Sequence, residues 1–90
     1  MQLPAHDTHD LLGRLTPEEE AMLVAFEVHR ALTKPRIARL LDTELREVEE
    51  ILGGLVRSGL LEESSRDVFE ISKFAYMAIW THLHRRGLTC

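Results

Sequence analysis

The apolar residues between positions 44 and 58 most constrain what this chain can fold into. Apolar residues recur here at intervals of three and four, which places their side chains on one face of an α-helix; they are Leu45, Val48, Ile51, Leu52, Leu55 and Val56. Gly59 comes directly afterwards, and glycine often ends a helix in the left-handed conformation. We therefore predict an amphipathic helix over 44–58, and the rest of the chain has to cover its apolar face.

Two further helices are predicted on the N-terminal side. Thr16, Pro17 and Glu19 form a capping box, with threonine as the cap, proline at the first helical position and glutamate at the third. This pattern predicts a helix over about 17–32. A second, short helix is predicted over 33–41, with a threonine as its cap and a proline in its first turn.

A small β-hairpin and one more helix are predicted on the C-terminal side. The short segments 60–63 and 67–71 flank a polar tip at 64–66, which is typical of a hairpin. The last helix is predicted over about 73–86, with Ser72 as its cap. Its apolar residues surround most of the helix, so we expect one face to cover the core and another to meet a partner.

The length of 90 residues predicts one small domain. A chain of this size buries roughly 60–65% of the surface that its unfolded form exposes, which leaves no room for a deep cleft between two lobes. The sequence contains no nucleophile elbow, phosphate-binding loop or dinucleotide fingerprint, so we expect neither an enzyme nor a cofactor. Residues 1–15 are predicted to be a flexible lead-in, with leucines anchoring its end, and 16–90 to form the domain.

The order helix, short helix, turn, helix and hairpin resembles a winged helix-turn-helix. The stretch 37–61, IARLLDTELREVEEILGGLVRSGLL, carries the resemblance without a gap. Its small Ala38 lets two helices cross closely. The chain is most similar to small bacterial regulators of the MarR and ArsR type. The resemblance implies a mainly α fold with a small β-hairpin, a winged helix-turn-helix with an additional C-terminal helix.

The resemblance also implies a DNA-binding transcriptional regulator. In such proteins the second helix of the pair enters the major groove, while the first helix and the wing hold phosphates. Arg46 is then expected to reach base edges and Glu47 to accept a hydrogen bond from a cytosine amino group. The residues implied for nucleic-acid binding are Thr33, Lys34, Arg36, Arg39, Arg46, Glu47 and Arg66.

The charge of the chain opposes this function. The 15 acidic and 11 basic side chains give a formal net charge of -4, and the helix predicted over 44–58 carries four glutamates against two arginines. Carboxylates beside a phosphate backbone repel it within a Debye length. A second hypothesis is therefore kept: a winged-helix adaptor or assembly module that binds protein and not DNA, through the acidic helix or the apolar last helix.

The last helix is the predicted site of contact with a second copy or another protein. In the regulators that the chain resembles, terminal helices commonly make a dimer. The residues predicted for this interface are Tyr76, Met77, Ile79, Trp80 and Leu83.

The helix predicted over 44–58 contains an unusual pair of glycines, Gly53-Gly54. Either the pair is tolerated on an exposed face of the helix, or it lets another helix pack closely against it.

The remaining chemistry-bearing residues give no metal site. His82 and His84 are two residues apart, so on a helix they point to different faces and cannot bind one metal together. The single cysteine, Cys90, excludes an internal disulfide and suits a reducing compartment. No apolar run has the roughly 18 residues of a membrane span, so we expect a cytoplasmic protein that does not bind membranes.

Overall fold

The structure is a computed structural model, and it describes residues 11–88. The described chain contains helices and one antiparallel sheet of three strands in the order β1-β3-β2. The elements are α2 (Pro17–His29), β1 (Ala31–Leu32), α3 (Lys34–Leu41), α4 (Leu45–Arg57), β2 (Leu61–Ser65), β3 (Val68–Ile71) and α5 (Tyr76–Arg85). This architecture confirms the predicted winged helix-turn-helix with an additional C-terminal helix.

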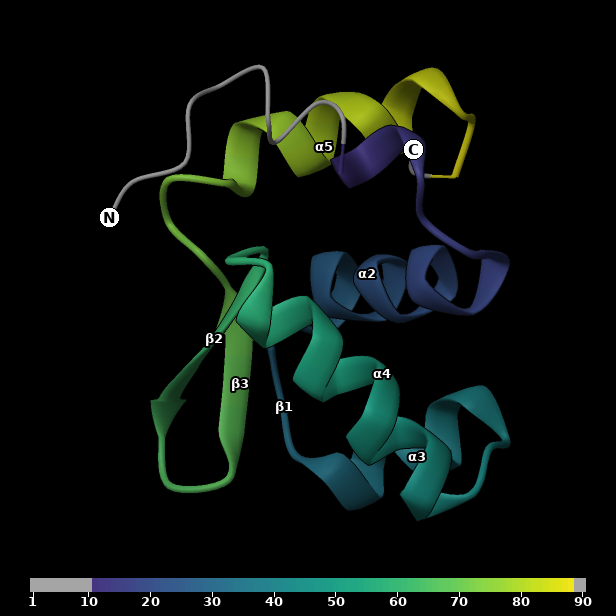
Figure 1. Cartoon of the computed structure of the whole chain (residues 1–90), viewed down its shortest axis with the longest axis vertical. Helices are drawn as coiled ribbons and strands as arrows, with labels where there is room; N and C mark the ends of the chain where they lie inside the picture. The colour runs from purple at the N-terminus through teal and green to yellow at the C-terminus, as the bar shows by residue number, and fades with distance from the viewer. Residues whose placement is uncertain (1–10, 89–90) are drawn as a thin grey trace.

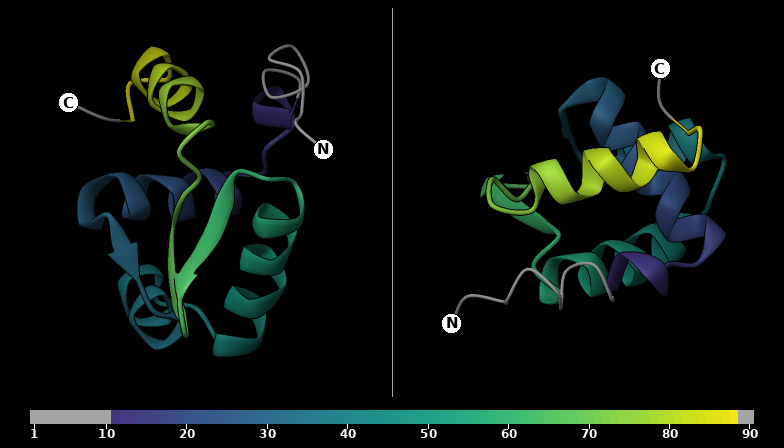
Figure 2. Two further views of the ribbon diagram at one scale, coloured as in Figure 1. Left: turned by 90° about the vertical axis from the view of Figure 1, so that its left-hand side faces the viewer. Right: turned by 90° about the horizontal axis from the view of Figure 1, so that it is seen from above.

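Helix α2 runs through the middle of the molecule (Figure 1). Helix α5 lies on one side of it, and α3, α4 and the sheet lie on the other, as the two further views confirm (Figure 2). Phe26 on α2, Leu52 on α4 and Ile79 on α5 are each at most 1% exposed. One apolar core therefore joins both sides of α2.

The end of the predicted lead-in belongs to this core as well. Leu12 is 2% exposed and Leu15 packs against the core. Residues 11–13 form a helical turn before α2. The rest of the predicted lead-in, residues 1–10, lies outside the described residues.

Helix α2 begins as predicted and ends earlier. The backbone N–H of Thr16 donates to Glu19 Oε1 at 2.8 Å, and the backbone N–H of Glu19 donates to Thr16 Oγ1 at 3.2 Å, which completes the capping box. The helix ends at His29 and not near position 32, because Arg30 adopts a left-handed φ of 67°. The next two residues form β1, which pairs with β3 and which the sequence did not predict.

The helix-turn-helix pair is close to its predicted bounds. Thr33 is the N-cap residue of α3, but its side chain makes no capping hydrogen bond, contrary to the expectation that it caps this helix. Asp42 ends α3 with a left-handed φ of 51°. After α4, Gly59 takes a φ of 86°, and the N–H of Leu60 donates to the carbonyl of Leu55 at 3.0 Å. This turn directs the chain from the helix into β2.

The predicted hairpin is present, whereas α5 starts later than expected. Strands β2 and β3 pair with a shift of register between Glu63 and Ser65, at the tip. Ser72 was predicted to cap the last helix at 73, but the helix begins at Tyr76. Ser72 is 2% exposed, and its carbonyl accepts from the N–H of Ala75 at 3.0 Å. Residues 73–75 therefore form a separate turn that joins β3 to α5.

Candidate nucleic-acid interface

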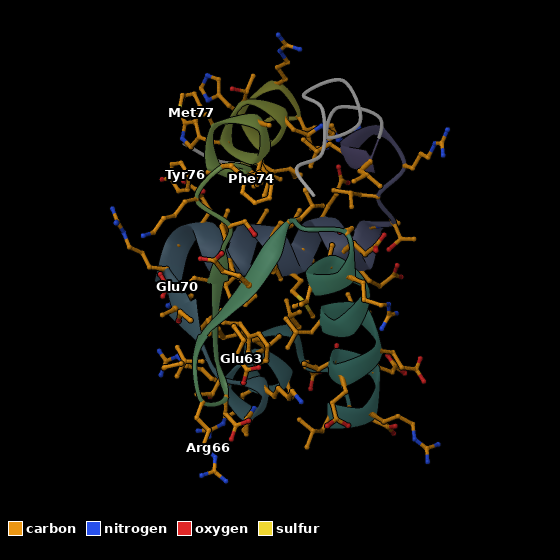
Figure 3. All side chains as sticks on the ribbon, turned by 60° about the vertical axis from the view of Figure 1, so that its left-hand side comes forward. Glu63, Arg66, Glu70, Phe74, Tyr76 and Met77 are labelled. Atoms are coloured by element: carbon orange, nitrogen blue, oxygen red, sulfur yellow. The ribbon has the colours of Figure 1, made fainter. Side chains whose placement is uncertain are left out.

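The elements expected to contact DNA lie at one end of the molecule. Helix α3, the first half of α4 and the tip of the hairpin face away from α5 (Figure 1). Arg66 projects from the hairpin tip at the end of the molecule opposite Tyr76 and Met77 (Figure 3). The fold thus separates the helix-turn-helix and wing from the C-terminal helix.

The arginines predicted to contact DNA on this end are at the surface. Arg36 and Arg39 on α3, Arg46 on α4 and Arg66 at the wing tip are all exposed. Thr33 is half-buried, and its carbonyl accepts the N–H of Ile37 at 3.0 Å. Four guanidinium groups from three elements are therefore available to an approaching polyanion.

Lys34 has a different environment because it is held by two neighbours. Its Nζ lies 3.6 Å from Oε2 of Glu49 on α4, with the lysine side chain 33% exposed and the glutamate 53% exposed. The same Nζ lies 5.9 Å from the ring centroid of Phe69 on β3. An ion pair as exposed as this one contributes at most about 1 kcal/mol, so a phosphate group can replace Glu49 as the partner of Lys34.

Carboxylates share the surface of α4 with Arg46. Glu47, Glu49 and Glu50 are exposed there, and Glu44, the N-cap residue, makes no side-chain capping hydrogen bond. These groups give the recognition helix an acidic face. The predicted charge conflict is therefore located on the element that would approach DNA most closely.

The wing tip is acidic too, and one of its carboxylates has a structural role. Oε2 of Glu63 accepts the backbone N–H of Asp67 at 2.9 Å. Asp67 adopts a left-handed φ of 61°, so this hydrogen bond stabilises the turn that carries Arg66. The Arg66 side chain is presented to solvent by a turn that Glu63 fixes.

The glycine pair in α4 is not packed against another helix of the described chain. A Cβ atom built at Gly53 or Gly54 meets only the Arg57 guanidinium, at 3.4 and 4.0 Å respectively. Both positions are half-buried. Close packing of a helix on this pair, one of the two explanations from the sequence, would therefore need a partner molecule.

The residues predicted for the protein interface divide between the core and the surface. Ile79 and Leu83 are both 0% exposed and pack in the core of this chain, so they are not available to a partner. Tyr76 is 39% exposed and Met77 66% exposed. Trp80 is half-buried, and its ring stacks on His84 at a centroid distance of 4.9 Å. The exposed apolar side chains of α5 that were predicted for the interface thus lie in its first turn.

A groove of about 370 Å³ borders this first turn, between α2, β3 and α5. The hydroxyl of Tyr76 donates to Oε1 of Glu27 at 3.3 Å. The other oxygen, Oε2 of Glu27, is buried and has no hydrogen-bond partner among the described residues. Tyr76 therefore closes one side of the groove through a hydrogen bond to α2.

Reasoning from the sequence missed one polar cluster that joins α2 to α5. Glu20 is 9% exposed. Its Oε2 lies 3.0 Å from both Nε2 of His82 and Nε of Arg86, and its Oε1 accepts from the second nitrogen of the Arg86 guanidinium at 3.1 Å. Burial alone would raise the pKa of Glu20, but the hydrogen bonds from His82 and Arg86 outweigh it and lower the pKa from 4.5. The position of Glu20, three residues before the buried Leu23, was the available signal.

No group of three or more His, Cys, Asp or Glu side chains is placed to hold a metal ion within residues 11–88. His82 is engaged with Glu20, and His84 stacks on Trp80. The two histidines thus have separate environments on α5. Within the same described range, no helix is long and apolar enough to cross a membrane.

The fold and the arrangement of its elements define a winged helix-turn-helix protein, and comparison with solved structures agrees with this class. Two crystal structures of the adhesin competence repressor AdcR from Streptococcus pyogenes, one of them C-terminally His-tagged, are similar to this chain, with TM-scores of 0.70 and 0.69 and 21% sequence identity. The matches cover 82% of this chain and 58% and 59% of the AdcR chains. The chain therefore spans less than two thirds of the repressor's length, and the similarity establishes a shared fold.

Comparison of the sequence with known families and proteins identifies no family for this chain. No protein-family model matches the chain, and no curated protein matches it. The resemblance to a winged helix-turn-helix is thus confirmed at the level of the fold.

Proposed function

We propose that this protein is a winged-helix DNA-binding transcriptional regulator. The observation that supports the proposal most directly is the placement of α3, the first half of α4 and the wing tip at one end of the molecule (Figure 1). These are the elements that winged-helix proteins bring to the major groove and the adjacent phosphates. The similarity to a repressor of the same fold supports it further.

The basic side chains have distinct roles in this proposal. Arg36, Arg39 and Arg66 bind phosphates, and Lys34 joins them when a phosphate replaces Glu49. Arg46 lies on the exposed side of α4 and is the residue that reaches base edges, where arginine pairs best with guanine. Phosphate contacts set the position of the protein on the duplex, whereas Arg46 supplies sequence preference.

The glutamates of α4 affect both the affinity and the selectivity of such a protein for DNA. Glu47 is exposed in the first turn of α4, where it is able to accept a hydrogen bond from a cytosine amino group. Beside guanine or thymine, which present no hydrogen-bond donor in the major groove, its charge is not compensated and is repelled by the acceptor groups and the phosphates. We therefore expect low non-specific affinity and a strong dependence on the correct site.

A salt titration of binding to duplex DNA tests the proposal. Four phosphate contacts per protomer predict that log K falls against log salt with a slope of about −3.6. Replacing Arg36 with alanine should reduce the magnitude of this slope by about 0.9, whereas Arg85→Ala, an exposed arginine on α5, should leave it unchanged. The regulator hypothesis is wrong if binding is undetectable at low salt, or if the affinity does not depend on salt.

We also propose that the regulator acts as a homodimer through the first turn of α5. Met77 is 66% exposed and the neighbouring Phe74 is 61% exposed, and Figure 3 shows both at the same end of the molecule as Tyr76. Apolar side chains gathered in this way on a small domain are typical of an interaction surface. A different protein partner at this surface is the alternative, and it would leave the isolated chain monomeric.

A protein-binding adaptor is the second candidate function, and the exposed carboxylates of α4 favour it. The two candidates differ in how they respond to replacing Glu47 and Glu50 with lysine. A DNA-binding regulator should gain general affinity for duplex DNA. An adaptor should show no DNA binding in the wild-type protein, and its double variant should lose the partner while remaining folded.

A further inference from the structure

A second groove lies between the first turns of α2 and the first half of α4, away from the α5 surface. Its volume is about 240 Å³. Met22 and Val48, both 0% exposed, line its floor, and Ala21 and Pro17 on α2 are exposed along it. The complete lining is Pro17, Glu18, Ala21, Met22, Leu41, Thr43, Glu47, Val48 and Ile51.

The charged residues that line the groove are all acidic. Its only charged lining residues are Glu18 on the α2 side and Glu47 on the α4 side, and no basic residue lines it. The neighbouring carboxylates of α2 are already engaged, since Glu19 completes the capping box and Glu20 binds Arg86. Within the described range, neither Glu18 nor Glu47 forms an ion pair, so both are available to a cation from outside.

We propose that this groove binds a basic amphipathic helical segment of a partner protein. One apolar side chain of the segment fills the groove, and lysine or arginine residues on either side of it pair with Glu18 and Glu47. Helices that dock in this way present apolar anchors at intervals of three and four residues. The proposal does not rest on DNA binding.

Size and charge argue for this occupant over others. The groove is smaller than the roughly 300–1,000 Å³ of small-molecule pockets, which favours a single anchoring side chain. The two carboxylates repel a nucleic acid. A second copy of this chain also carries exposed arginines, so the test below includes it as an outcome that would overturn the assignment to a partner protein.

The test uses the full chain and a defined probe, an 18-residue helical peptide with leucine at intervals of three and four and lysine at the flanking positions. Amide chemical shifts and calorimetry report binding. We expect shifts centred on Ala21, Thr43 and Ile51. The double variant Glu18→Lys with Glu47→Lys should bind about 10-fold more weakly, since two ion pairs are replaced by repulsion.

Matched controls separate a specific groove from general attraction to an acidic protein. The double variant Glu62→Lys with Glu70→Lys changes the net charge equally on the sheet, where the two residues face each other on β2 and β3, and should retain the affinity. Ala21→Gln fills the exposed edge of the groove with a neutral side chain and should weaken binding without unfolding α2, because glutamine is a good helix former.

Four results would overturn the inference. The first is an equal loss of affinity in both charge-reversal double variants, and the second is equal binding of a peptide that carries glutamate in place of lysine. The third is a set of chemical-shift changes confined to the surface of Tyr76 and Met77, and the fourth is that the basic peptide does not bind. Shifts at Ala21 that appear with rising protein concentration and no peptide would also overturn it, because they would assign the groove to a second copy. Loss of DNA binding in an independent assay would leave it intact.

Discussion

The buried carboxylate of Glu20 provides the most direct test of how α5 is held against α2. The Glu20 side chain is 12% exposed, and it accepts hydrogen bonds from His82 and from two nitrogens of Arg86. An ionised carboxylate only accepts, so Nε2 of His82 carries the proton it shares. The cluster joins residues 66 positions apart in the sequence.

Glu20→Gln keeps the volume of the side chain and removes its charge. One of the two oxygens becomes an NH2 donor that faces the donors of His82 or Arg86. Hydrogen bonds to a charged group contribute about 1.5–3 kcal/mol each, but the Arg86 side chain is 57% exposed and water competes for it. We therefore expect a loss of about 2 kcal/mol in the free energy of unfolding, which corresponds to a fall in Tm of about 8–16 °C for a domain of this size.

Urea and thermal unfolding followed by circular dichroism at pH 7 measure this loss. The matched control is Glu18→Gln, which removes an exposed carboxylate from the same first turn of α2. It changes the interaction with the helix dipole only, so its effect should stay within about 0.5 kcal/mol. An effect of Glu20→Gln as small as that of Glu18→Gln would refute the structural role of the cluster.

The pH dependence gives a second check on the same reasoning. Because the pKa of Glu20 is lowered in the folded protein, its stabilising contribution is present above the ordinary value of 4.5 and is lost as the pH falls through the folded pKa. The difference in unfolding free energy between wild type and Glu20→Gln should therefore shrink as the pH falls below about 4.5. A difference that stays the same from pH 7 to pH 3 would contradict the assignment of the charge to Glu20.

Three further predictions concern DNA binding, assembly and the turn after α4. Glu49→Gln frees Lys34 from its ion pair, so it should strengthen DNA binding several-fold at low salt and steepen the salt slope; a lower affinity in filter binding would count against the role of Lys34. Met77→Glu should convert the proposed dimer to a monomer in light scattering, unless α5 binds a different protein. Gly59→Ala should destabilise the fold by about 1 kcal/mol in urea unfolding, because φ at this position is 86°; unchanged stability would mean that the turn relaxes.

The sequence predicted those elements whose signals are local. The capping box at Thr16 placed the start of α2, and the spacing of the apolar residues from Leu45 to Val56 placed α4 to within one residue at each end, although Leu45 itself is 46% exposed. Strand β1 was missed because two residues carry no periodicity, and their conformation is set by pairing with β3, about 40 residues away in the chain. The contact of Glu20 with α5 was missed for the same reason, because its partners also lie far away in the chain.

The exposed face of α5 could be predicted only in part, for a geometric reason. Apolar residues surround the helix, so the sequence does not indicate which face meets the core. In the structure Ala75, Ile79 and Leu83, four residues apart, form the buried face. Tyr76 and Met77 follow Ala75 by one and two positions, so their side chains point away from the buried face. They therefore reach solvent, whereas Ile79 and Leu83 do not.

The carboxylates on the two edges of α4 have different surroundings. Glu49 belongs to the edge facing the wing, beside Gly53 and Val56, where Lys34 compensates it. Glu47 belongs to the opposite edge, beside Val48 and Ile51, where no basic side chain lines the groove. A duplex approaching from the wing side therefore meets a neutralised edge, whereas a cationic partner is favoured on the α2 side. The acidity of α4 is thus compatible with both binding modes, but Glu47 takes part in both, so a basic partner in the groove competes with DNA for this carboxylate.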